Sequence, residues 1–106
     1  MTFQQRTRDF MVRHGLGHTP QIHALDLFSE VGEVAKSLLQ ASDYGRSPLK
    51  ASPALSEELG DAFYSLVALA ESLNIDLETA LDSALVKYRA RLATQGHAGS
   101  AHSREP

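Results

Sequence analysis

Apolar residues recur every three or four positions along most of this chain, which is the period of an α-helix with one buried side. The pattern predicts helices over residues 3–13, 20–40, 53–73 and 77–93. No segment shows the strict apolar and polar alternation of a half-buried strand. The sequence therefore predicts an all-α fold, a small antiparallel helical bundle of about four helices.

Residues that begin or interrupt helices separate these four segments. The glycine-containing stretch 14–18 ends the first helix. Thr19 before Pro20 and Ser52 before Pro53 each place a favourable N-cap ahead of a proline that fits the first helical turn. Asp76 is the expected N-cap of the fourth helix. Residues 41–51 read as a loop.

The chain has 106 residues and is expected to form one helical domain over residues 1–94. Residues 95–106 lack apolar periodicity and are expected to be a disordered C-terminal tail. A chain of this length buries a modest core. The segment 53–73 is apolar around an unusually broad part of its circumference, which indicates burial on more than one side and predicts at least a homodimer.

Composition excludes several classes of function. The net charge is -3 and no basic face is evident, which argues against a protein that binds duplex nucleic acid. The absence of cysteine excludes disulfides, thiolate metal sites and a cysteine nucleophile. No apolar run reaches the length of a membrane span and the N-terminus has no leader-like apolar stretch. We expect a soluble cytoplasmic protein with no membrane partner.

Two acidic pairs stand out against this apolar background, Glu30 with Glu33 and Glu58 with Asp61. Carboxylates three positions apart lie on the same side of a helix, and both pairs fall on the border of their helix's apolar stripe. If the two stripes pack together, four carboxylates converge. Mg²⁺ selects such a set because it prefers oxygen ligands.

Other interpretations of these residues stay open. A single acidic pair beside an apolar stripe is usually only solvated. Each pair here, however, encloses a glycine, Gly32 or Gly60, which costs roughly 0.8 to 1.0 kcal/mol inside a helix. Close approach of another helix or of a ligand would explain either glycine. A di-iron site is excluded because no histidine follows a glutamate by three positions. His23, near the acidic border, reads as a partly exposed histidine without a special role.

Five segments together resemble the MazG-like, all-α nucleoside triphosphate pyrophosphohydrolases over about residues 20 to 92. They are Leu27–Lys36, Ser42–Gly45, Glu57–Phe63, Ile75–Leu81 and Lys87–Arg91. The resemblance implies a helical bundle that forms a homodimer or homotetramer. It also implies that Glu30, Glu33, Glu58 and Asp61 are catalytic residues that bind Mg²⁺, with Mn²⁺ as a substitute. The implied substrate is a nucleoside triphosphate, cleaved to the monophosphate and pyrophosphate.

The same resemblance suggests that Lys87, Tyr88 and Arg91 bind the substrate, with the two cations on its phosphates. The alternative is a solvated basic helix end, favoured by the helix dipole. Many relatives carry a further glutamate where this chain has Ser29. The general base is therefore unassigned, with the four ligands and Asp26 as candidates. Relatives often have an asparagine at the position of Leu85, so the substrate contacts of this helix are less secure than the metal site.

Two other classes of function remain open from the sequence. A helical protein–protein adaptor would use the broad apolar face of residues 53–73 and would need no metal. A non-catalytic sensor would bind nucleotide without turnover, which the serine at position 29 makes conceivable. No residue spacing identifies the base or the sugar.

Overall fold

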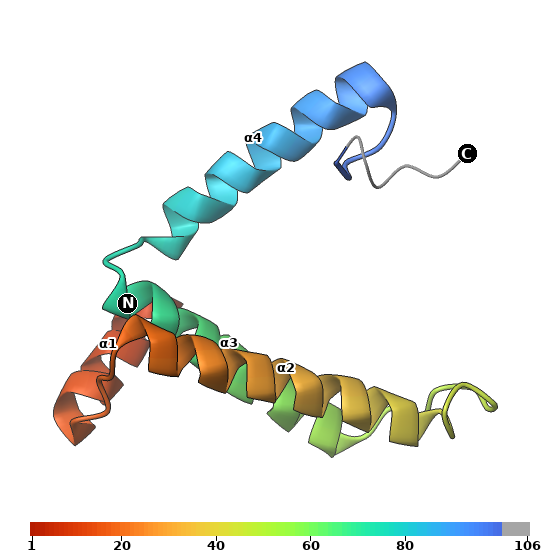
Figure 1. Cartoon of the computed structure of the whole chain (residues 1–106), viewed down its shortest axis with the longest axis horizontal. Helices are drawn as coiled ribbons and strands as arrows, with labels where there is room; N and C mark the ends of the chain where they lie inside the picture. The colour runs from red at the N-terminus through yellow and green to blue at the C-terminus, as the bar shows by residue number, and fades with distance from the viewer. Residues whose placement is uncertain (101–106) are drawn as a thin grey trace. The chain divides into compact units, whose positions relative to one another are not determined.

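The computed structural model describes residues 1–100, and within that range the chain forms four α-helices and no strand (Figure 1). The helices are α1 (Phe3–His14), α2 (Pro20–Ala41), α3 (Pro53–Ser72) and α4 (Leu77–Gln95). The predicted all-α fold is confirmed, with helix bounds within two residues of those expected. The last six residues of the expected tail, 101–106, lie outside the described residues.

The chain divides into two compact units, Met1–Ile75 and a second unit that begins at Asp76 and contains α4. In the first unit α2 and α3 run antiparallel and pack along each other, while α1 packs against α3 (Figure 1). The long α2–α3 contact sets the register in which the two acidic borders meet.

The helix starts are capped in different ways. Thr2 forms a capping box with Gln5 at the start of α1. Asp76 caps α4 as expected, its carboxylate accepting from the Thr79 backbone N–H at 3.1 Å. Thr19 and Ser52 stand at the N-cap positions of α2 and α3 but form no side-chain cap hydrogen bond. The predicted helix starts are right at both places, and the following proline marks them better than the hydroxyl does.

Polar side chains join α1 to the C-terminal end of α3. Gln4 is buried and donates to Glu71 Oε2 and to the Ile75 carbonyl, each at 2.7 Å. Arg8 donates to both oxygens of the same carboxylate, at 2.6 and 3.2 Å. Edge-to-face aromatic pairs flank this network, Phe3 with Phe63 and Phe10 with Tyr64. These contacts orient α1 on α3.

His23 is buried, with 4% of its surface exposed, which corrects the expectation of a partly exposed side chain. Its Nε2 accepts a hydrogen bond from the His18 backbone N–H at 3.1 Å. This hydrogen bond satisfies a backbone N–H of the α1–α2 connection. The helical pattern of the sequence does not indicate how that connection is oriented. The role of His23 is therefore structural.

The apolar core is small. Among the described residues its buried apolar side chains are Met11, Val67, Ala68 and Ala70. Large apolar side chains of α2 and α3 remain exposed, among them Phe28 at 81% and Leu59 at 58%. A modest core was expected for this length, and the apolar surface left uncovered is extensive. None of the helices in residues 1–100 has the length and apolar character needed to cross a membrane.

A candidate metal centre between α2 and α3

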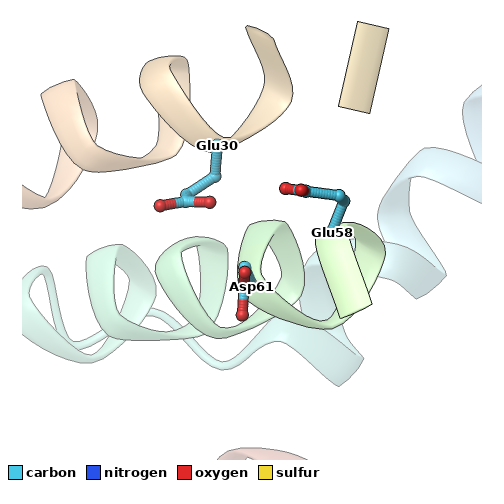
Figure 2. Close-up of side chains that lie close together, drawn as sticks. All are labelled: Glu30, Glu58 and Asp61. Carbon is cyan, nitrogen blue, oxygen red and sulfur yellow. The ribbon is translucent and has the colours of Figure 1, made fainter. Parts of the chain in front are cut away.

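Packing of α2 on α3 brings three of the four predicted acids together. Carboxylate oxygens of Glu30, Glu58 and Asp61 lie within 4.8 Å of one another. Figure 2 shows Glu30 pointing from α2 toward α3, and Glu58 projecting from α3 toward α2. Glu30 and Glu58 are half-buried and Asp61 is exposed, so the cluster stands at the edge of the helix contact and is open to solvent.

Glu33, the fourth predicted acid, is exposed and does not belong to this group. Its negative charge nevertheless acts on the cluster, because it is the largest of the charges that raise the pKa of Glu58. The geometry therefore favours three primary ligands with Glu33 beside them.

The pKa of Glu58 is raised above its ordinary value. Partial removal from water is the largest cause, and the negative charges of Glu33, Asp61 and Glu30, followed by that of Glu57, add to it. No basic side chain of residues 1–100 pairs with Glu30, Glu58 or Asp61. Like charges gathered without a cation are the condition that a bound metal ion relieves.

The donor set suits a hard divalent cation. All three donors are carboxylates, and no imidazole belongs to the group. Mg²⁺ takes one or two carboxylates together with water and substrate phosphates, so an open, all-oxygen cluster at a helix border fits its chemistry. The same donors suit Mn²⁺.

The two glycines between the acids have space around them. A Cβ built at Gly32 or at Gly60 would meet no other atom within 4 Å. Packing of α1, α2 and α3 on one another therefore does not require either glycine. Close approach of a ligand would explain their presence.

The predicted substrate-binding residues lie together on α4, within the second unit. Lys87 Nζ is 5.2 Å and Arg91 Cζ is 5.9 Å from the centre of the Tyr88 ring. Both cationic side chains therefore lie near the Tyr88 ring, and the cation–π attraction limits the movement of each. Of the candidate bases, Asp26 is exposed and stands outside the acidic group.

Sequence patterns missed one contribution to the site. Glu57 is not among the predicted acids, yet its charge helps to raise the pKa of Glu58. Its position next to Glu58 in the sequence was the available signal, because neighbouring charges interact through water even when their side chains diverge.

The family model for the MazG nucleotide pyrophosphohydrolase domain matches residues 18–94, which include all four acids and the basic residues of α4. The chain belongs to this family. The resemblance seen in the sequence is thereby confirmed, and the MazG match covers α2, α3 and nearly all of α4.

Individual MazG relatives agree with the match. The chain is 40% identical over 68 residues to YpjD of Bacillus subtilis, an uncharacterized protein, covering 61% of this chain and 60% of YpjD. It is 38% identical over 88 residues to dCTP pyrophosphatase 1 of Rattus norvegicus, covering 79% of this chain and 52% of that enzyme. The chain thus spans less than two thirds of the length of either relative.

A solved structure shares the fold. A crystal structure of Bacillus subtilis YpjD, described as that of a candidate pyrophosphatase, superposes with a TM-score of 0.68 at 34% identity. The superposition covers 83% of this chain and 90% of the YpjD chain. The helical arrangement that supports the acidic cluster is therefore that of a MazG-like protein.

Proposed function

We propose that this MazG-family protein hydrolyses a nucleoside triphosphate to the nucleoside monophosphate and pyrophosphate, with Mg²⁺ as its cofactor. One observation carries the proposal: carboxylates of Glu30, Glu58 and Asp61 converge from two helices with no basic partner among the described residues. Such an activity would remove damaged or surplus nucleotides from the nucleotide pool.

In the proposed reaction the acids hold the cation at the border of α2 and α3. A Mg²⁺ ion bound there would neutralise charge on the α and β phosphates and lower the pKa of a bound water. Glu33 lies beside the cluster and is exposed, so it can act either as a fourth ligand or as the base that accepts the proton of water. With serine at position 29, Glu33 is our first choice for the base and Asp26 the second.

The basic residues of α4 have the chemistry to bind the outer phosphates. Lys87 and Arg91 carry positive charge on one side of α4, and Tyr88 restrains both. A guanidinium matches a phosphate through paired N–H donors, and an ammonium serves as a point charge. Their charge would stabilise pyrophosphate as it departs.

Self-association is part of the proposal. The exposed apolar side chains of α2 and α3, including Phe28 and Leu59, need a cover, and a second copy of the chain supplies a surface of the same kind. The open space at Gly32 and Gly60 would admit it. We propose a homodimer or homotetramer, while a cytoplasmic location stays a prediction.

Product analysis tests the proposed reaction. Purified protein with Mg²⁺ is incubated with the common and oxidised nucleoside triphosphates, dCTP included because one relative is named for it. Phosphorus NMR should show pyrophosphate and monophosphate as primary products, with loss of both in the Glu58→Gln variant. Orthophosphate as the first product would contradict the proposal.

A second experiment, read together with the product analysis, separates the alternatives. Calorimetry with Mg²⁺ and a nonhydrolysable triphosphate detects a nucleotide sensor, which binds without releasing pyrophosphate. A protein–protein adaptor that uses the exposed apolar face of α3 would bind neither. The acidic cluster gives no reason to expect an adaptor, because its charges weaken the chain unless something binds them.

A further inference from the structure

The chain turns back on itself directly after α4. Gly96 adopts the left-handed conformation, with φ of +78°, and its N–H donates to the Leu92 carbonyl at 3.2 Å. A left-handed residue at this position ends a helix and reverses the path of the chain. The next residues therefore lie along the last turn of α4.

Side chains of α4 hold this turn in place. Arg91 Nη1 donates to the Ala98 carbonyl at 3.2 Å, and Gln95 Nε2 donates to the Gly99 carbonyl at 2.7 Å. Over residues 85–100 the half-buried residues are Arg91, Gln95, His97 and Ala98, whereas the others are exposed. The turn and the two side chains thus share one small covered patch at the end of α4, where the neighbouring residues are exposed.

Arg91 is restrained on two sides by these contacts. Its Cζ lies 5.9 Å from the centre of the Tyr88 ring, and its Nη1 is occupied by the Ala98 carbonyl. A guanidinium has five N–H donors, so several remain for a phosphate. A long side chain that is already fixed loses less freedom when it binds a ligand.

We propose that the turn Gly96–Gly99 is a positioning element for Arg91, which fixes the guanidinium in the orientation that receives a substrate phosphate. The proposal rests on the proposed function for the role of Arg91. It adds that residues outside the match to the family model, which ends at residue 94, tune phosphate binding in this chain. None of the turn residues would touch the substrate.

Gly96 offers a graded test, because the left-handed conformation tolerates asparagine better than alanine and tolerates valine least. In Gly96→Val the turn should detach and release Arg91. We expect KM for the triphosphate, and the calorimetric Kd for a nonhydrolysable triphosphate with Mg²⁺, to rise about threefold to tenfold. Gly96→Asn is the matched control and should stay near wild type. The Kd for Mg²⁺ alone should not move.

The decisive measurement is a double-mutant cycle with Arg91→Ala. If the turn acts through Arg91, Gly96→Val weakens triphosphate binding in the wild-type background and has no further effect once Arg91 is removed. Equal weakening in both backgrounds would overturn the proposal, because the turn would then act on α4 as a whole. No weakening in Gly96→Val would overturn it as well. Gln95→Ala, which loosens the turn without changing its backbone, replaces Gly96→Val if that variant does not fold.

The outcomes separate this proposal from the proposed reaction. Full triphosphate affinity in Arg91→Ala overturns the positioning role while pyrophosphate release can still occur. Coupling between Gly96 and Arg91 in calorimetry without any pyrophosphate release would support positioning and contradict hydrolysis.

Discussion

Glu30 on α2 and Glu58 on α3 approach within 4.8 Å, carboxylate oxygen to carboxylate oxygen, across the contact between the two helices (Figure 2). Asp61 completes the group. Two half-buried acids that face each other without a cation weaken the folded chain, because each charge raises the free energy of the other. The arrangement is explained if the folded protein normally binds a divalent ion there.

Replacing a clustered acid by its amide should remove Mg²⁺ binding and pyrophosphate release while the fold survives. The variants are Glu30→Gln, Glu58→Gln and Asp61→Asn, and Glu33→Gln is expected to follow them. We expect kcat/KM to fall by about two orders of magnitude or more, as for the loss of an essential electrostatic group. Calorimetry with Mg²⁺ and product NMR measure the two effects.

Glu57→Gln is the matched control, since it removes a carboxylate next to Glu58 that lies outside the ligand group. It should retain Mg²⁺ binding. In the absence of metal the cluster variants should melt no lower than wild type, because like-charge repulsion is relieved. Loss of stability together with unchanged Mg²⁺ binding would show that the acids are structural.

Glu58 should make the stability of the metal-free protein depend on pH. Its pKa in the folded, metal-free protein lies above the ordinary value of 4.5. The folded state therefore holds this proton more tightly than the unfolded state, and the stability that it contributes is present below pH 4.5 and lost as the pH rises through the raised pKa. Thermal melts of wild type and Glu58→Gln in chelator should converge at acid pH and diverge above it, with the variant more stable. Parallel curves would contradict the assignment.

Much of the fold and the outline of the site follow from sequence patterns. Helical periodicity places the four helices, and the spacing of Glu58 and Asp61 puts both on one side of α3. The meeting of Glu30 with Glu58 follows from packing two apolar stripes. These features depend on local period and on burial, which a single sequence records.

Other features depend on tertiary contact and left no local pattern. Glu33 has the same spacing from Glu30 as Asp61 has from Glu58, yet it falls outside the cluster while its charge still acts on Glu58. The role of Glu71 depends on Gln4 and Arg8 of a distant helix. Burial of His23 depends on the path of the α1–α2 connection.

Glu71→Gln should loosen α1 from α3 and destabilise the protein at neutral pH by about 1–2 kcal/mol, a value kept low because Arg8 is half exposed. Hydrogen bonding from Arg8 is the largest of the causes that hold the pKa of Glu71 below 4.5. Its stabilisation is therefore present above pH 4.5 and lost as the pH falls through the lowered pKa. Urea unfolding of this variant and of Asp9→Asn, an exposed acid of α1, measures the difference. Equal stability of the two variants at pH 7 would contradict the prediction.

Lys87→Ala should raise KM for the triphosphate about tenfold and leave the affinity for Mg²⁺ unchanged, because an ammonium binds phosphate but cannot ligate a cation. Arg89→Ala removes an exposed cation two positions away on α4 and serves as the control. Steady-state kinetics and metal calorimetry separate the two effects. If both variants raise KM equally, the effect is the general charge of α4 and not a specific contact.

The last prediction concerns the uncovered apolar surface of α2 and α3. Light scattering should return at least twice the chain mass of 11.5 kDa at micromolar concentration. Phe28→Asp should shift the protein toward the single-chain mass, because the side chain is 81% exposed in one copy and a carboxylate there would be buried at the subunit contact. Leu49→Asp carries a similar change on an exposed residue of the α2–α3 connection, outside both helices, and should leave the mass unaltered. A wild-type mass near 11.5 kDa throughout would contradict the prediction.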